Sequence, residues 1–287
     1  MSQTPNAMPE LSRFEQPYDW ETIDATVHEV GGVVLRRLFS SAEVERFNRE
    51  IDAYLMQHQA AGLPSSGSSD YDTFLGHRTV RLHGLLEKFA SAADWLCRDE
   101  LVDWAERLLD PVATSVLLNA AELIQIGPGE PGQHLHRDTD SWPLAPLGEH
   151  PLMVNALVAL DPFTLENGAT RVVPESWRWE RDRRATEQEM LRSTMDAGDA
   201  LVFRGDIVHG GGANATERPR RAISLSYCAG WLRPVENGIL NVSRDRAKSL
   251  PKRLQAMLGY AAYDGSRDNG GLVGLYENGD PAVLLEG

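Results

Sequence analysis

Cysteine is nearly absent from this sequence, which has only Cys97 and Cys228 among 287 residues and no CxxC pattern. Such a chain lacks both the cysteine framework of a small secreted domain and the paired thiolates of a structural zinc site. It also lacks any apolar run of about 18 residues, the length that spans a bilayer. Its N-terminal stretch, MSQTPNAMPELSRFEQPYDW, has no basic segment followed by an apolar one. We therefore expect a cytoplasmic protein without membrane spans.

Positive charge is scarce as well, because 28 Lys and Arg residues stand against 42 Asp and Glu residues, for a formal net charge of −14. A surface of this sign repels nucleic acids and anionic membranes. Neither is expected as a partner, whereas a small-molecule substrate is. A homodimer is compatible with the sequence, which does not determine the oligomeric state.

The pattern of apolar residues predicts one domain that is mainly β with helical additions. Residues 1–17 are polar and unpatterned, which is typical of a flexible tail, so the domain is expected over residues 18–287. Between residues 113 and 232, short apolar or alternating runs are separated by turn residues. This texture favours a β-sandwich or jelly roll over a regular alternation of strands and helices.

Helices are predicted on both sides of that core, over residues 23–30, from residue 41 to near residue 62, over 91–109 and over 244–259. The second helix begins with a capping box formed by Ser40 and Glu43. Its apolar stripe consists of Val44, Phe47, Ile51 and Leu55. Residues 64–77 are predicted to form a loop and residues 263–287 an irregular tail.

The segment PGQHLHRDTDSWP, residues 131–143, places His134, His136, Asp138 and Asp140 at alternate positions. If it is extended, all four side chains lie on one face. His136 and Asp138 form an HxD motif, which is weak on its own in a chain with 8 His and 42 acidic residues. A third ligand is predicted at His209, in GDALVFRGDIVHGGGAN. Two His and one carboxylate form the facial triad of non-haem Fe(II) oxygenases, which leaves coordination positions open.

Arg220 follows His209 on what is predicted to be the next strand, in RPRRAISLS. A 2-oxo acid that chelates iron at one end needs its far carboxylate held, and Arg can hold it with two charge-assisted hydrogen bonds. Arg221 alternates to the opposite face and is predicted to be structural. A zinc hydrolase could use the same His and Asp ligands but has no need of Arg220.

The sequence resembles the phytanoyl-CoA dioxygenase family of Fe(II)/2-oxoglutarate-dependent oxygenases from about residue 25 to 235. The resemblance is carried by QHLHRD, ENGATRVVPESW, GDALVFRGDIVHGGGAN and RRAISLS. HRD followed by Trp142 and Pro143, together with NGAT, is most similar to the branch that tailors natural products, including fungal meroterpenoid oxygenases and verruculogen synthase. The resemblance implies a double-stranded β-helix, a cupin-like jelly roll. It places His136 and Asp138 on an early core strand, His209 on a late strand and Arg220 on the last.

The resemblance also implies the cofactor set: Fe(II), with 2-oxoglutarate and dioxygen as cosubstrates. Gln133 and Thr170 match positions at which the family contacts 2-oxoglutarate. On a regular strand Gln133 would face away from the ligands, so its role requires a bend near Gly132, and Thr170 is equally explained by β-propensity. Because Asp138 is present, C–H oxidation by hydroxylation, desaturation or a related reaction is favoured over halogenation.

The substrate is predicted to be an apolar small molecule, an intermediate of natural-product biosynthesis. Aromatic and polar residues expected to line its pocket could equally belong to the core; they are Tyr71, Phe74, Trp142, Ser226 and Trp231. One alternative is hydroxylation of an acyl thioester, whose phosphates would need a basic patch at Arg78 and Arg81. Another is a non-catalytic cupin-like protein that binds a metal or ligand.

Overall fold

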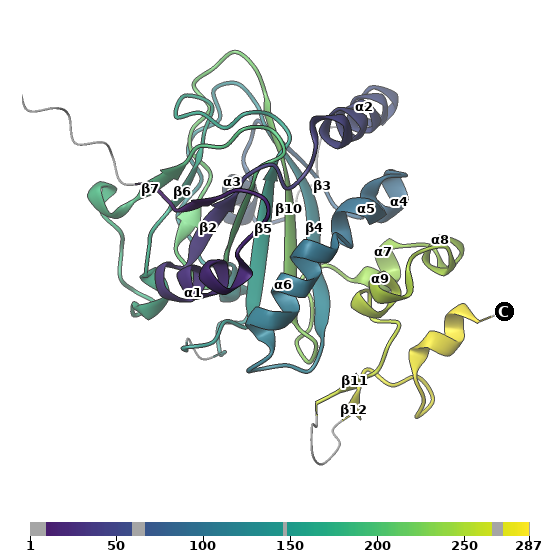
Figure 1. The fold of residues 1–287 in the computed structure, drawn as a ribbon. Coiled ribbons are helices and arrows are strands. Elements are labelled where there is room, and N and C mark those ends of the chain that lie inside the picture. Colours follow the sequence, from purple (N-terminus) through teal and green to yellow (C-terminus); the bar gives the residue numbers. More distant parts are fainter. Residues whose placement is uncertain (1–9, 59–66, 146–147, 266–271, 287) are drawn as a thin grey trace, which may run out of the picture.

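The computed structural model describes residues 10–58, 67–145, 148–265 and 272–286, and a large sheet forms the centre of the fold (Figure 1). Its strand order is β1-β2-β8-β5-β10-β4-β3, and all neighbours are antiparallel except β1 beside β2. The strands are β1 (Arg13–Phe14), β2 (Gly32–Leu35), β3 (Thr79–Leu82), β4 (Val116–Ile126), β5 (Met153–Ala159), β8 (Ala200–Arg204) and β10 (Arg220–Ala229).

A smaller sheet has the order β7-β6-β9, formed by β7 (Leu191–Ser193), β6 (Thr170–Val172) and β9 (His209–Gly210). An apolar cluster joins the two sheets, with Leu157 and Phe203 from the large sheet and Val172 from the small one. Central strands β5 and β8 are buried on both faces, which explains why they read as continuous apolar runs. The predicted jelly-roll class, mainly β with helical additions, is confirmed.

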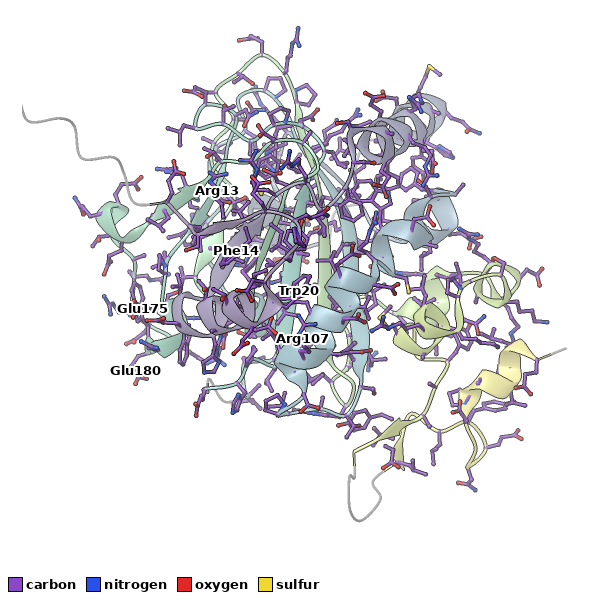
Figure 2. All side chains as sticks on the ribbon, in the orientation of Figure 1. Arg13, Phe14, Trp20, Arg107, Glu175 and Glu180 are labelled. Atoms are coloured by element: carbon purple, nitrogen blue, oxygen red, sulfur yellow. The ribbon has the colours of Figure 1, made fainter. Side chains whose placement is uncertain are left out.

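Helices cover the other face of the large sheet and build a second apolar core. They include α1 (Trp20–Val30), α2 (Ser41–His58), α4 (Leu85–Lys88), α5 (Ala92–Leu96) and α6 (Asp99–Leu109). In α6 the residues Leu101, Trp104 and Ala105 recur at helical spacing and are fully buried. Arg107 of α6 pairs with Asp24 and lies over the ring of Trp20, which joins α6 to α1 (Figure 2).

The predicted start of α2 is confirmed by its hydrogen bonds. The backbone N–H of Ser40 donates to the Glu43 carboxylate, and the backbone N–H of Glu43 donates to the Ser40 hydroxyl. Val44, Phe47 and Ile51 of the predicted stripe are buried. The predicted end near residue 62 lies outside the described residues.

Several predicted boundaries differ from the structure. Helix α3 (Ser69–Leu75) replaces part of the expected loop, because the Ser68 hydroxyl accepts the backbone N–H of Tyr71 and caps it. The expected helix over 91–109 is interrupted between α5 and α6, and Pro251 separates α8 (Arg244–Lys248) from α9 (Lys252–Met257). Within the expected tail, Leu11 is buried between the sheets and β1 pairs with β2, so order begins before residue 17.

The C-terminal part is less irregular than predicted. It contains α7 (Gly238–Asn241), the hairpin β11 (Tyr263–Asp264) and β12 (Leu272–Val273), and the 3₁₀ helix η4 (Pro281–Leu285). Figure 1 shows the hairpin beyond one end of the large sheet, where Tyr263 of β11 packs against Ala229 at the end of β10. Short 3₁₀ turns elsewhere are η1 (Asp138–Ser141), η2 (Ser176–Arg178) and η3 (Glu187–Glu189). Across the described ranges, no helix combines the length and apolar character that a bilayer span requires.

Candidate metal centre

Two of the predicted ligands come from adjacent extended segments. The backbone N–H of His136 donates to the carbonyl of His209 across 2.9 Å, and the reverse bond has the same length. This bridge brings the two imidazole rings to 4.5 Å between centroids. Asp138 follows at the start of η1, and one ligand atom from each of the three residues lies within 4.8 Å of the others. The chain thus brings together the trio that the sequence predicts.

The segment that carries His136 and Asp138 is not the regular strand that was expected. Only His136 makes a bridge, and the chain turns into η1 at Asp138. Buried Arg137 stabilises this turn by donating to the carbonyls of Asp206 and Ser176. The extended segment on which a four-residue face would depend is therefore absent: the side chain of His134 is exposed, and Asp140 pairs with Arg181 at the edge of the cavity that Asp138 also lines.

Both imidazoles have the tautomer that a metal requires. Nδ1 of His136 lies 3.0 Å from the carbonyl oxygen of His134, and Nδ1 of His209 lies 3.1 Å from that of Ile207. Because a carbonyl only accepts, each Nδ1 must carry the proton and donate it. The lone pair of each neutral ring is therefore on Nε2, which faces Asp138.

Asn155 of β5 orients the carboxylate of Asp138. Its amide Nδ2 donates to Asp138 Oδ2 across 2.8 Å, while Oδ1 lies 3.3 Å from Nε2 of His136. Burial by itself would raise the pKa of Asp138, but the two imidazoles and this hydrogen bond outweigh it and lower the pKa to about 2. The carboxylate is therefore ionised at neutral pH, the form that binds metals.

His209 is held in the neutral form. Its burial lowers the pKa to about 4, although the neighbouring Asp138 acts in the opposite direction. At neutral pH the pair thus consists of a carboxylate and a neutral imidazole. These are the protonation states in which a metal competes with no proton for either group.

The three side chains lie in the wall of a cavity of about 510 Å³, a size typical of small-molecule sites. Alternate residues of β4 and β10 form the wall of the large sheet, and the exposed lining is more apolar than polar. Phe74 of α3 closes one side, with its ring 4.7 Å from that of His136 and nearly perpendicular to it.

Arg220 lies at one end of this cavity and is nearly fully buried. It donates to the carbonyl of Gly168 and lies over the ring of Phe163, but forms no ion pair with any residue that the structure describes. Within the described part of the chain its Nε has no hydrogen-bond partner, and neither has the buried hydroxyl of Thr170, which lines the same cavity. Burial lowers the pKa of Arg220 to about 9, so the guanidinium remains charged at neutral pH.

Gln133 also lines the cavity, because the segment before His136 is irregular rather than a flat strand. Its Oε1 accepts the backbone N–H of Gly211 and its Nε2 donates to the carbonyl of Phe74. Because this stretch is not a regular strand, the alternation that would turn Gln133 away from the ligands does not apply. Arg221, by contrast, pairs with Asp52 outside the cavity.

The expected substrate residues divide into two groups. Tyr71, Phe74 and Ser226 line the cavity. Trp142 and Trp231 do not: their indole N–H groups donate to the carbonyls of Arg233 and Val112, respectively. Trp231 follows the end of β10 and is 44% exposed, so it packs on the surface rather than facing the metal ligands. Neither tryptophan belongs to the wall of the cavity, so neither is retained in the proposed substrate site.

A charged network in the cavity wall was not predicted. Arg81 of β3 pairs with Glu122 of β4 across 2.7 Å, and His83 lies between Glu122 and Glu236. The basic patch of Arg78 and Arg81 that the acyl-thioester alternative would need does not form, because Arg81 is buried and lines the cavity. Glu122 stands out as a charged residue in the largely apolar strand β4, and Asn155 stands out as a polar, uncharged residue in β5. These two residues are the sequence features from which polar contacts in the cavity wall could have been predicted.

Comparisons of this sequence with known proteins all point to one family. The sequence pattern of the family described as phytanoyl-CoA dioxygenase matches residues 27–222. The chain is 32% identical over 267 residues to dioxygenase FUM3 of Gibberella moniliformis, covering 89% of this chain and 87% of that protein. It is 31% identical over 264 residues to the iron/alpha-ketoglutarate-dependent dioxygenase penM of Penicillium thymicola, covering 87% and 81%.

Solved structures agree on the fold. The non-heme alpha ketoglutarate dependent epimerase SnoN, from nogalamycin biosynthesis, superposes with a TM-score of 0.61 at 20% identity. The match covers 76% of this chain and 87% of SnoN. At this identity the likeness bears on the fold alone.

Proposed function

The chain belongs to the phytanoyl-CoA dioxygenase family, and on that basis we propose that it oxidises a C–H bond of a largely apolar, ring-bearing small molecule. It is an iron- and 2-oxoglutarate-dependent dioxygenase. We further propose which residues carry this activity and which class of substrate it acts on.

The observation that carries the proposal is the pairing of two features in one cavity. His136, Asp138 and His209 offer two imidazole nitrogens and one carboxylate oxygen, which suits Fe(II). In the same cavity the buried guanidinium of Arg220 has no ion pair, and its Nε and the hydroxyl of Thr170 lack partners among the described residues. These orphaned donors fit the far carboxylate of 2-oxoglutarate, so the residues present suit both groups.

Each residue then has a defined task. When bound, iron with 2-oxoglutarate supplies oxidising power from dioxygen, with succinate and carbon dioxide as by-products. Asn155 holds Asp138 through one oxygen and so leaves the other free to ligate. Arg220 and Thr170 fix the far end of the cosubstrate, and Gln133 flanks it. Phe74, packed edge-on against His136, limits the access of water to that ligand.

The shape and lining of the cavity support the substrate class. Tyr71, Phe74, Leu157 and Met153 supply aromatic and aliphatic surface, which favours a ring-bearing molecule. Ser224 and Ser226 place two hydroxyl groups on the same wall, suited to an oxygen substituent. We propose an intermediate of natural-product biosynthesis, in keeping with the HRD and NGAT motifs.

The acyl-thioester alternative receives no support from the structure. The arginine that would have contributed to a basic patch, Arg81, is buried and paired with Glu122. The phosphates of a CoA group would therefore meet an acidic protein without that local compensation. A non-catalytic protein that binds only a metal would not need a buried guanidinium without an ion pair among the described residues in the same cavity as the three ligand atoms.

The test is anaerobic addition of Fe(II) and 2-oxoglutarate to the protein, followed by visible absorption. We expect a weak charge-transfer band in the wild type and its loss in His136→Ala, because one ligand nitrogen is removed. His134→Ala is the matched control, since it removes an exposed imidazole and keeps the carbonyl that holds His136. Absence of the band in the wild type, or its persistence in His136→Ala, would refute the assigned ligands.

A further inference from the structure

Arg171 of β6 lies behind the metal centre and outside the cavity. Its neighbour Thr170 lines the cavity, and side chains alternate along a strand, so Arg171 faces the opposite side of the small sheet. Whereas Arg192 on the adjacent strand β7 pairs with Glu187, Arg171 forms no ion pair with a residue that the structure describes. A half-buried guanidinium without a carboxylate partner needs other acceptors.

The acceptors of Arg171 are two backbone carbonyls, one from each ligand-bearing segment. Its Nη2 donates to the carbonyl of Gln133, three residues before His136. The same nitrogen lies 3.1 Å from the carbonyl of Gly211, two residues after His209. One charged group therefore connects the two segments that carry the imidazole ligands.

The backbone around the guanidinium leaves room for it. A Cβ at position 132 would lie 3.3 Å from Nη2 of Arg171, and a Cβ at position 210 would lie 3.4 Å from it. At position 210 the same Cβ would also lie 3.2 Å from the carbonyl oxygens of Gln133 and His134. Gly132 and Gly210 thus let the side chain of Arg171 approach both segments closely.

The hydrogen bonds of Arg171 affect the position of the imidazole ligands, because few other hydrogen bonds join the segments that carry His136 and His209. Between residues 133–136 and 209–211 run the two bonds of the His136–His209 bridge and the bond from the Gln133 N–H to the Gly211 carbonyl. The same stretches of chain are joined on either side by the Asn214 N–H, which donates to the Glu130 carbonyl, and by Arg137, which donates to the Asp206 carbonyl. The side chain of Gln133 adds one more, to the Gly211 N–H. The segment before His136 belongs to no regular strand, so its position depends on this short set.

We propose that Arg171 is a positioning residue that fixes the separation and register of the segments bearing His136 and His209, and thereby preorganises the metal site. The inference rests on the proposed function, since it assumes that these two imidazoles bind the metal. Groups that orient metal ligands from outside the coordination sphere typically alter metal affinity by about 10- to 100-fold. The guanidinium acts here through backbone carbonyls rather than through the imidazoles themselves.

The test compares Arg171→Met, Arg171→Lys and Arg192→Met in the full chain. Met keeps the apolar stem of Arg171 and removes its donors, and we expect roughly 10-fold weaker Mn(II) binding by calorimetry. Lys retains one charged donor and should restore part of the affinity. Arg192→Met makes the same chemical change on the neighbouring strand without touching either segment, and should bind Mn(II) as the wild type does.

Hydrogen exchange supplies a second readout that needs no metal. In Arg171→Met the amides of Gln133, His136 and His209 should exchange faster than in the wild type, while those of β5 and β10 should not change. Wild-type Mn(II) affinity and wild-type exchange in Arg171→Met would overturn the inference. Equal weakening by Arg192→Met would overturn it too.

Two further outcomes distinguish a failure of this inference from a failure of the proposed function. If Arg171→Met does not fold, Arg171→Lys carries the test, and wild-type affinity and exchange in that variant would overturn the inference. If the wild type binds neither Mn(II) nor Fe(II) with 2-oxoglutarate, the proposed function fails. Faster exchange of the three amides would then still report the structural link.

Discussion

Single residues decide which chemical species this cavity can hold. Asn155 and the carbonyls of His134 and Ile207 determine which oxygen and which nitrogens remain available to a metal. Arg220 plays the corresponding part for a carboxylate, because it is charged, nearly fully buried and without an ion pair among the described residues. A buried charge of this kind is costly unless a ligand supplies the countercharge.

At this scale we predict the effect of Arg220→Met. Loss of a charge-assisted pair of about 1.5–3 kcal/mol should raise the KM for 2-oxoglutarate roughly 10- to 100-fold. The kcat at saturating cosubstrate should change much less, because the metal ligands are untouched. Steady-state kinetics, measured as succinate release, separates the two parameters.

The neighbouring residue provides the control for that experiment. Arg221→Met removes a guanidinium that pairs with Asp52 on the other face of β10, so the KM for 2-oxoglutarate should stay at the wild-type value. An equal rise of KM in both variants, or a loss confined to kcat in Arg220→Met, would contradict the assigned role.

At the scale of elements, a charged network joins strands β3 and β4 to the segment that follows β10. Glu236, beyond β10, accepts the backbone N–H groups of Gly84 and Ala121 and lies 3.6 Å from Nδ1 of His83. Glu122 of β4 lies on the other side of the same imidazole. The network thus links β4, the turn after β3 and the C-terminal segment at the cavity wall.

This network predicts a pH dependence of stability. Burial alone would lower the pKa of His83, but hydrogen bonds to Glu122 and Glu236 outweigh it and raise the pKa from 6.5 to about 10. Because the folded-state pKa is the higher one, the stabilisation is complete below pH 6.5 and is lost as the pH rises to about 10. The loss should be on the order of 1–2 kcal/mol after allowing for solvent screening of this partly exposed ring.

Urea denaturation across that pH interval measures the effect. His83→Gln keeps a hydrogen-bonding side chain of similar size but cannot be charged, so its unfolding free energy should decline less than that of the wild type. Parallel declines in the two proteins would show that His83 is not the group responsible.

For the whole molecule, ligand binding should appear as global stabilisation. The metal ligands come from the segment after β4 and from β9, and the proposed cosubstrate residues come from β6 and β10, so binding joins both sheets. A ligand that binds only the folded state at about 100 times its Kd adds about 2.7 kcal/mol to the free energy of unfolding. Mn(II) with 2-oxoglutarate should therefore raise the melting temperature by several degrees.

Differential scanning calorimetry with and without a chelator measures this shift. Asp138→Ala should melt at the same temperature with and without Mn(II), because it lacks the only carboxylate in the ligand trio. A full shift in that variant would mean that Mn(II) binds elsewhere.

The sequence by itself determined the chemistry of the centre and the class of fold. HxD, His209 and Arg220 could be recognised because their residue types and order along the chain are what the metal and cosubstrate require. A β-sandwich or jelly roll could be predicted because alternation and turn residues are local properties of each strand, and the family resemblance then implied the jelly roll.

Only the tertiary structure decided what surrounds those residues. Asn155 reaches Asp138, and Arg171 reaches Gln133, through pairings between segments far apart in the chain, which no local pattern encodes. For the same reason no local pattern shows that Trp142 and Trp231 lie outside the cavity wall, because their positions depend on the long-range partners of their indoles. Residue type and spacing can be read from one stretch of the chain, whereas the direction in which a side chain packs depends on which strands meet in the fold.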